Sequence, residues 1–295
     1  MPRSSKRRAS GDEEGAAGKK QQRGEGTEGD APALRLKYWQ GRGLMEPGRV
    51  LLALKGRWPG SGYADLRHVD AEDLAKQKAL GKAFKGCEGA TIRPMADAGP
   101  LDANLGRLPV LECEQGAVGQ SLAIYVYLAS ELELAGKNAF ELASIVSFAE
   151  HLREMDRAYR ALVPYGTAPS AALSDLWFNP SEATDYAGPA NAAHREARRL
   201  RWFLGRMEGL VGPKFCVGGA MSLADVLLWS ALEDHLPADD AHRDLPKHTR
   251  EPFGDHERTH KLLAAEYPKL AKVIEGVAKH SHLKKWLKMR GTQLF

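Results

Sequence analysis

Residues 106–129 read GRLPVLECEQGAVGQSLAIYVYLA, and this stretch decides which fold the sequence predicts. The segment 108–113 is predicted to be a strand. A turn at 115–116 leads to a short second strand around 117–118, and a helix is predicted over 120–128. The stretch is therefore an antiparallel hairpin followed directly by a helix.

The preceding residues add a parallel strand–helix–strand unit. Residues 34–38 alternate apolar and basic side chains, as a half-buried strand does, and a helix is predicted over 47–54. A second strand is predicted over 63–69, a helix over 70–85 and a long loop over 86–106. Together with the hairpin and its helix, this order is typical of a thioredoxin-like α/β domain.

From Gly136 onward the apolar residues recur with the period of a helix, and no strand is predicted. Two loop-like inserts rich in Pro, Ser, Ala, Asp and His interrupt this part, at 166–193 and 236–260. The apolar faces that carry the prediction are Leu200, Phe203, Leu204, Met207 and Val211 in one helix, and Leu270, Val273, Ile274 and Val277 in another. We therefore predict a thioredoxin-like domain over 34–130 and an all-α domain over 136–295.

Residues 1–33 contain no Val, Ile, Leu, Phe, Trp or Tyr, and they mix charges of both signs. Such a stretch buries too little apolar area to offset its ordering entropy, so we expect a disordered tail. Its two basic clusters, at 6–8 and 19–23, fit either a solvated tail or a bipartite nuclear signal.

The composition excludes several classes of protein. No apolar run approaches the roughly 18 residues that a membrane helix needs, and no secretory signal opens the chain. A formal net charge of +4 does not indicate a nucleic-acid partner. The three cysteines, Cys87, Cys113 and Cys216, form no CxxC motif. We expect a reducing, cytoplasmic compartment and no disulfide framework.

Three short motifs carry candidate chemistry. Tyr38 ends the first predicted strand beside the glycine-rich turn 40–43, where a phenol can face a cleft. Proteins with the thioredoxin-like fold usually have a cis proline where Pro109 stands, and a cis Leu108–Pro109 bond would turn the Leu108 backbone towards a bound peptide. Gln120-Ser121 begins a helix, and free amides at a helix N-terminus bind a carboxylate.

Each motif also has a structural interpretation when it is taken alone. Tyr38 fits a buried tyrosine with a satisfied hydroxyl, and Pro109 fits a proline at a strand edge. Gln120-Ser121 fits an ordinary N-cap. Their occurrence in this order favours a site for a small tripeptide, with a carboxylate at Ser121 and a thiol near Tyr38.

With these motifs, the chain from Leu34 to about Arg290 resembles the cytosolic glutathione transferases of the mu/sigma type. The opening YWQGRGL is similar to the mu class, and GRLPVLE, QSLAIYVYLA and LAGK are similar to the sigma class. FCVGGAMSLADVLLW resembles the capping motif of the helical domain, and YPKLAKVIEGVAKHSHLKKWLKMR resembles the last helices. The resemblance implies the glutathione transferase fold.

The resemblance also implies roles for individual residues. Tyr38 matches the tyrosine whose hydroxyl donates a hydrogen bond to the sulfur of glutathione and so favours the thiolate. Arg107 would meet the glycyl end, Leu108 the cysteinyl backbone, and Gln120 and Ser121 the γ-glutamyl end. The residues expected to bind glutathione are Tyr38, Trp39, Leu44, Arg107, Leu108, Pro109, Gln120 and Ser121, with Tyr38 as the catalytic one.

The function implied is conjugation of glutathione, as co-substrate, to a small hydrophobic electrophile in a detoxifying homodimer. Glutathione-dependent isomerisation is a narrower enzymatic variant. The alternative is a non-catalytic glutathione transferase-like module for binding or protein interaction. A glutaredoxin-like oxidoreductase is disfavoured, because no cysteine lies at the Tyr38 turn.

Two further motifs are interpreted structurally. Ser222 and Asp225 have the spacing of a capping box. Several histidines and aspartates gather near the insert 236–260, but their spacing fits no known metal site, and we expect no metal. These residues are Asp239, Asp240, His242, His248, His256 and His260.

Overall fold

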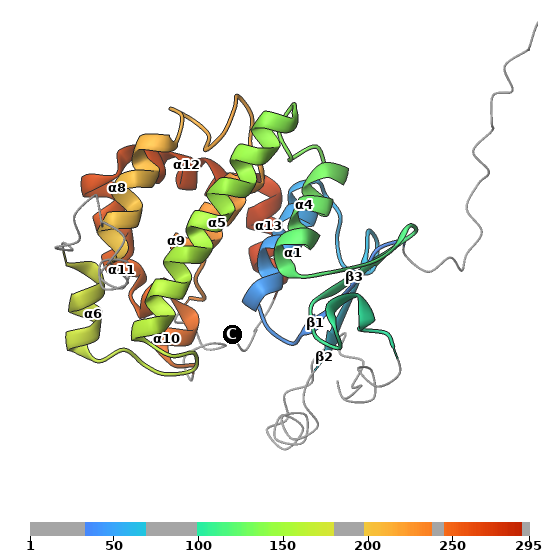
Figure 1. Cartoon of the computed structure of the whole chain (residues 1–295), viewed down its shortest axis with the longest axis horizontal. Helices are drawn as coiled ribbons and strands as arrows, with labels where there is room; N and C mark the ends of the chain where they lie inside the picture. The colour runs from blue at the N-terminus through green and yellow to red at the C-terminus, as the bar shows by residue number, and fades with distance from the viewer. Residues whose placement is uncertain (1–32, 69–98, 180–197, 238–244, 291–295) are drawn as a thin grey trace, which may run out of the picture. The chain divides into compact units, whose positions relative to one another are not determined.

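The computed structural model describes residues 33–68, 99–179, 198–237 and 245–290 (Figure 1). The chain separates into two units, Met1–Ala31 and Pro32–Phe295, and the first of them lies outside the described residues. The predicted tail up to residue 32, the predicted helix 70–85 and most of the predicted loop 86–106 also lie outside them.

A four-stranded mixed sheet forms the first part of the second unit. Its strands are β1 (Arg35–Trp39), β2 (Ala64–His68), β3 (Val110–Cys113) and β4 (Gly116–Gly119). The strand order is β2-β1-β3-β4. β1 runs parallel to β2, and β3 is antiparallel to both β1 and β4. This arrangement confirms the predicted parallel unit and hairpin.

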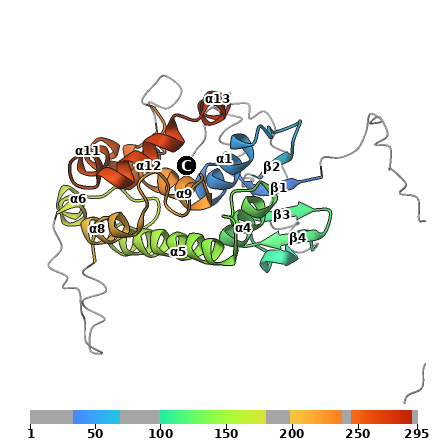
Figure 2. The same cartoon turned by 90° about the horizontal axis from the view of Figure 1, so that it is seen from above.

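Two helices, α1 (Glu46–Leu54) and α4 (Ser121–Glu131), lie together on one side of the sheet (Figure 2). Pro47 lies near the start of α1, where its fixed φ suits the first turn of a helix. Gly56 follows the end of α1 with a left-handed φ of +70°, which glycine adopts readily and which stops the helix. Ile124 and Leu128 of α4 are fully buried in the core that these helices share with the sheet. The apolar side of each helix therefore anchors it to the sheet.

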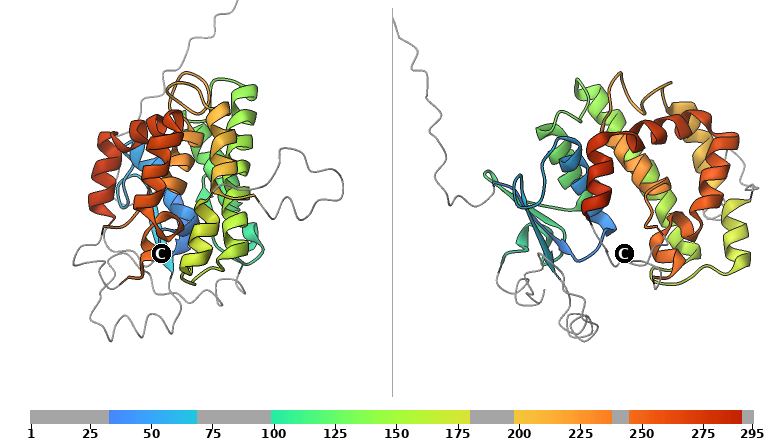
Figure 3. Two further views of the ribbon diagram at one scale, coloured as in Figure 1. Left: turned by 90° about the vertical axis from the view of Figure 1, so that its left-hand side faces the viewer. Right: turned by 180° about the vertical axis from the view of Figure 1, so that it is seen from behind.

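The second part of the unit consists of helices and connecting turns, with no strand among its described residues. Its elements are α5 (Ala139–Leu162), α6 (Ala171–Phe178), α8 (Leu200–Leu210), α9 (Leu223–Leu232), α10 (Lys247–Arg250), the 3₁₀ turn η3 (Pro252–Gly254), α11 (His256–Glu266), α12 (Pro268–Ala278) and α13 (Ser281–Met289). α9 packs between α5 and α12 (Figure 2), and Figure 3 shows the same layering from other sides. Both predicted apolar faces, in α8 and α12, are buried.

The expectation of loops at the two later inserts holds for residues 166–170 and 236–237 and is wrong for several other described segments. Residues 171–178 of the first insert form α6, because Ser170 caps its N-terminus and the bulky side chains of Trp177 and Phe178 are buried. The second insert contains α10, η3 and the start of α11. The proline and small polar residues at these places cap short helices instead of forming open loops.

The predicted capping box at the start of α9 is present. The Asp225 carboxylate accepts hydrogen bonds from the Ser222 amide at 2.7 Å and from the Ser222 hydroxyl at 2.8 Å. It also accepts one from the amide of Cys216, which belongs to the preceding loop. None of the helices in the described ranges is long and apolar enough to cross a bilayer.

Candidate functional site

The sheet topology brings the three sequence motifs to one end of the sheet. Tyr38 and Trp39 end β1, and the Leu108–Pro109 pair precedes β3, whose first residue, Val110, pairs with Lys37. Val110 also pairs with Gly119, after which Gln120 leads into α4. Because β1 and β4 are both antiparallel to β3, the end of each lies beside the start of β3.

Tyr38 is buried, with 8% of its surface exposed, and its hydroxyl lies over the turn that follows β1. That hydroxyl accepts a hydrogen bond from the Leu44 amide at 3.0 Å. A Cβ atom on Gly43 would lie 2.6 Å from the same oxygen, so the turn approaches the phenol too closely for any larger residue. Burial raises the pKa of Tyr38, although the Leu44 amide acts in the opposite direction.

The peptide group after Leu44 is also held from the helix α4. The Tyr125 hydroxyl donates a hydrogen bond to the Leu44 carbonyl oxygen. Arg49 donates to the Gly41 carbonyl at 2.7 Å, and its guanidinium lies 5.9 Å from the centre of the Tyr38 ring. The turn beside Tyr38 is therefore fixed by side chains from both α1 and α4.

The Leu108–Pro109 bond is cis, as predicted. Asn104, a buried residue of the 3₁₀ turn η2 (Asp102–Asn104), donates from its side-chain amide to the Pro109 carbonyl at 3.0 Å. Its side-chain oxygen accepts from the Gln120 amide group, also at 3.0 Å. Asn104 thus links two of the three motifs, and its 3₁₀ turn corrects the expectation of a loop for residues 102–104.

Gln120 begins α4 with a φ of +66°, in a region that residues other than glycine rarely adopt. Such a conformation usually persists at functional positions. The Gln120 side chain makes no capping hydrogen bond to α4, so the expected role as an ordinary side-chain N-cap does not describe it. Ser121 is the first residue of the helix and is half-buried.

The remaining predicted residues line the rim of this end of the sheet. Trp39 and Leu44 are exposed over 36% and 55% of their surfaces. Arg107 is also exposed, and its Nε donates to the Asn104 carbonyl at 3.3 Å. Apolar side chains on the surface at such a site are suited to an apolar ligand.

Two tyrosines of the helical part differ in their exposure. Tyr159 is buried in an aromatic cluster with Trp177 and Phe253, at ring-centre distances of 5.1 and 5.0 Å. Tyr165 is exposed. Tyr159 therefore packs in the core, whereas the ring of Tyr165 is accessible.

A buried ionic network attaches the Tyr38 turn to the helical part. Arg42 Nη1 lies 3.3 Å from Asp234 Oδ2, and Arg42 Nη2 donates to the Thr249 carbonyl at 3.0 Å. Arg290 donates to Asp234 at 2.8 Å and to Glu46 at 2.9 Å. Burial alone would raise the pKa of Glu46, but the charges of Arg290 and Arg49 outweigh it and hold that pKa below its usual range.

The sequence analysis missed three residues that shape the site: Asn104, Tyr125 and Arg42. Tyr125 lies one helical turn after Ser121, a spacing that places both on one face of α4. Asn104 lies in a stretch that was interpreted as an unstructured loop. Arg42 lies within the conspicuous turn 40–43, but its partner Asp234 is far away in the sequence.

Comparison with known proteins agrees with this architecture. Residues 177–290 match the family model of the glutathione S-transferase C-terminal domain. Glutathione S-transferase 4 of Caenorhabditis elegans is 29% identical over 139 residues, which cover 46% of this chain and 54% of that protein. The chain therefore matches about half the length of this curated relative.

Solved structures show the same fold at low identity. The glutathione S-transferase of Ascaris lumbricoides has a TM-score of 0.55 and 21% identity, over 90% of this chain and all of that one. The monomeric Na-GST-3 of Necator americanus also has a TM-score of 0.55, with 20% identity over 89% and 99% of the two chains. The Pi-class enzyme of Onchocerca volvulus follows at a TM-score of 0.53 and 20% identity, over 88% and 93%. The chain thus has the glutathione transferase fold, and its residues 177–290 match the glutathione S-transferase C-terminal domain.

Proposed function

We propose that this protein conjugates glutathione to small hydrophobic electrophiles, using Tyr38 to stabilise the glutathione thiolate. The observation that carries the proposal is the hydrogen bonding of the Tyr38 hydroxyl. Its oxygen accepts from the Leu44 amide, which leaves its own proton to be donated to a ligand. Burial also raises the pKa of Tyr38, so the phenol keeps that proton at neutral pH.

In the proposed reaction, Tyr38 donates a hydrogen bond to the sulfur of bound glutathione. A free thiol has a pKa of about 8.5, and a hydrogen bond to the charged form lowers it. The thiol proton passes to water, the thiolate forms a bond to the electrophilic carbon, and the leaving group departs with the electron pair of its bond. Tyr38 is not consumed and does not change its protonation state.

The rest of glutathione would extend along the end of the sheet. The γ-glutamyl carboxylate would bind the first turn of α4 through the Ser121 hydroxyl and the backbone amides, where the helix dipole favours an anion. The cysteinyl backbone would pair with Leu108, and Arg107 would meet the glycyl carboxylate. Trp39 and Leu44 offer exposed apolar surface for the electrophile.

The Ser121→Ala variant tests the ligand's orientation. Because a hydrogen bond to a charged group contributes about 1.5–3 kcal/mol, the KM for glutathione should rise about 10-fold or more. The kcat at saturating glutathione should change little, since the thiol end is untouched. Steady-state kinetics with a generic aryl halide measure both constants.

The matched control is Ser130→Ala on the same helix, where the hydroxyl bonds only to the Val126 carbonyl within α4. It should leave the KM for glutathione unchanged. Equal KM values for wild type and the Ser121 variant would contradict the assignment of the carboxylate to this helix. Retention on glutathione-agarose without any turnover would instead indicate a non-catalytic binding module.

Several finer expectations also remain proposals. The motifs at 38–44 and 106–129 favour a mu- or sigma-like class. Isomerisation of an apolar substrate would use the same thiolate. A role in detoxification would follow from conjugation, and a cytoplasmic location is the compartment that a sequence with three cysteines and no CxxC motif favours.

We also propose a homodimer in which Leu105 is an apolar contact. Leu105 is 82% exposed and has a φ of +54°, and it ends the turn η2 beside the glutathione motif. An apolar side chain this exposed offers surface that a second copy of the chain could cover. Leu105→Asp should therefore yield monomers. Aspartate tolerates a positive φ, so the monomeric variant should melt at the same temperature as monomeric wild type.

Analytical ultracentrifugation across a dilution series measures this change. Met289→Asp on α13 serves as the control, because Met289 is also an exposed apolar residue, at 49%. This variant should sediment with the same molecular mass as wild type. A wild-type chain that sediments as a monomer, or a variant that remains a dimer, would contradict the proposed contact.

A further inference from the structure

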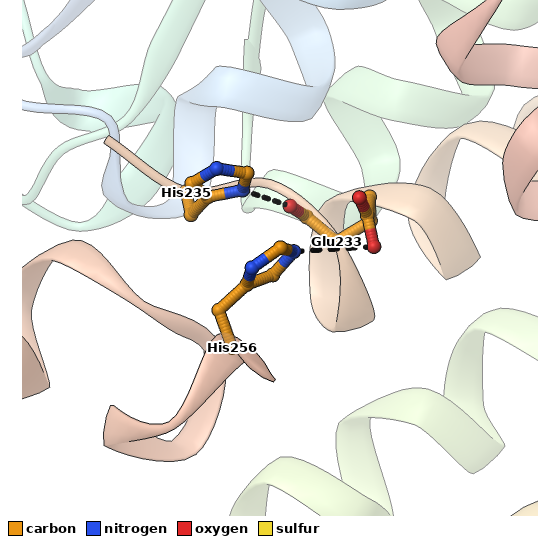
Figure 4. A group of neighbouring side chains, drawn as sticks. All are labelled: Glu233, His235 and His256. Atoms are coloured by element: carbon orange, nitrogen blue, oxygen red, sulfur yellow. Dashed lines mark hydrogen bonds and ion pairs between the residues drawn. The ribbon is translucent and has the colours of Figure 1, made fainter. Parts of the chain in front are cut away.

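We propose that Glu233, His235 and His256 form a binding site for one divalent transition metal ion, with zinc as the best-suited ion. The three side chains lie together between the end of α9 and the start of α11 (Figure 4). One ligand atom from each lies within 4.8 Å of the others. From the sequence we expected no metal, and the histidines considered there included His256 but not His235.

The side chain of His256 contacts the carboxylate of Glu233. His256 Nε2 lies 3.2 Å from Glu233 Oε2, and this nitrogen is buried. At this distance Nε2 either carries a hydrogen that it donates to the carboxylate, or presents a lone pair that a metal ion between the two atoms would bind. The contact therefore accommodates a bound ion as well as a hydrogen bond, and the other ligand atoms distinguish the two.

The separation of these two atoms suits tetrahedral coordination. Zinc binds imidazole nitrogen at about 2.0–2.1 Å and carboxylate oxygen at about 2.0–2.2 Å. Two ligand atoms on a tetrahedral ion with such bonds are about 3.3 Å apart. The observed 3.2 Å is therefore close to the spacing that a bound ion would impose.

His235 is held in the orientation that metal-binding histidines adopt. Its Nδ1 lies 2.8 Å from the Glu233 carbonyl oxygen, to which it donates a hydrogen bond, so Nε2 carries the lone pair. The His235 and His256 rings are stacked with centres 3.8 Å apart. This stacking keeps both imidazoles beside the carboxylate before any ion binds, which lowers the entropic cost of coordination.

A third histidine is within reach of the same carboxylate. His260 lies one turn after His256 on α11, and its Nδ1 is 3.2 Å from Glu233 Oε2. Its side chain is largely exposed, so it or a water molecule can complete four coordination positions. Two or three imidazoles with one carboxylate favour zinc or another ion of the late first row over magnesium or calcium.

The same contacts also fit a simple alternative, in which a protonated His256 pairs with Glu233 and tethers α11 to α9. In that case, binding of a metal ion would be weak, unspecific and insensitive to His235. The two interpretations therefore differ in stoichiometry and in the effect of a single ring substitution at His235.

The test uses the full chain purified without a histidine tag and treated with a chelator. Titration with Zn²⁺ by calorimetry should give one equivalent, and Co²⁺ should produce the visible absorption of a tetrahedral site. His235→Phe keeps the stacked ring but removes both nitrogens, and Glu233→Gln removes the charge. Each should weaken Zn²⁺ binding at least about 10-fold, the lower limit seen for groups that merely support metal ligands.

His248→Phe is the matched control, because His248 lies on α10 outside the Glu233 cluster. It should bind Zn²⁺ as wild type does. The melting temperature of the wild type should also rise with Zn²⁺ and that of His235→Phe should not. Absence of stoichiometric Zn²⁺ binding, or equal affinity in wild type and His235→Phe, would overturn the proposal, and neither readout depends on glutathione turnover.

Discussion

Tyr38→Phe should lower the kcat for conjugation of an aryl halide by about 10-fold to 100-fold, while the KM for glutathione stays nearly unchanged. The lost hydrogen bond is one to a charged sulfur, which contributes about 1.5–3 kcal/mol, and each 1.36 kcal/mol is a factor of ten in rate. The glutathione backbone and carboxylates would keep their other contacts. The fold should not suffer, because the phenylalanine ring fills the same buried position at the end of β1.

The pH profile gives this prediction a second readout. If Tyr38 lowers the pKa of the bound thiol, its removal should move the rise of kcat/KM to higher pH, towards the value of about 8.5 for a free thiol. The deficit of the variant should therefore shrink as the pH increases. Stopped-flow or steady-state assays over the pH range measure it, with loss of glutathione thiolate absorbance as a direct check.

Tyr63→Phe is the matched control. Tyr63 is also a buried tyrosine of the first part of the unit, but it lies before β2 and away from the three motifs. Within the part of the chain that the structure describes, its hydroxyl has no hydrogen-bond partner. This variant should conjugate as wild type does. Unchanged turnover in Tyr38→Phe, or the same loss in both variants, would show that Tyr38 does not activate the thiol.

Much of the fold could be predicted because the periodicity of apolar residues along the sequence matches the helices and strands that form. The alternation in 34–38 and the hairpin 108–119 placed the strands, and the helical period of Leu270, Val273 and Val277 placed a buried face. These signals depend on neighbouring residues alone. The segments misjudged as loops, such as 171–178, are short, and their helical state depends on tertiary burial of Trp177 and Phe178.

The site was less predictable, because its supporting contacts join distant residues. Tyr38, Pro109 and Gln120 stand in recognisable motifs, and the sheet register brings them to one end. Asn104, by contrast, has no sequence signal for its bonds to Pro109 and Gln120. The pairing of Arg42 with Asp234 across 192 residues likewise emerges only when the helical part has packed.

That ionic network leads to the second large prediction, made for Arg290→Met. Arg290 donates to both Glu46 and Asp234, and all three side chains are at most 4% exposed. Removal of one partner from a buried ion pair leaves a charge without compensation and typically costs about 3–5 kcal/mol. The free energy of unfolding should fall by that amount, as measured by urea denaturation followed by circular dichroism.

Lys288→Met is the control, since Lys288 is an exposed residue of the same helix, α13, and this change should alter the stability by about 0.5 kcal/mol or less. The double variant Glu46→Gln with Arg290→Met should recover part of the loss, because the neutral amide removes one of the two buried carboxylates that lose Arg290 and keep only Arg49 or Arg42 as a nearby charge. The Trp286 indole can still donate to that side chain, as it does to Glu46 at 2.8 Å.

Arg290→Met should also raise the KM for glutathione. Glu46 begins α1 four residues after Arg42, so the loss of its partner Arg290 should make the turn beside Tyr38 less rigid. A stability loss no larger than that of the control would mean that hydration, and not Arg290, compensates these two carboxylates.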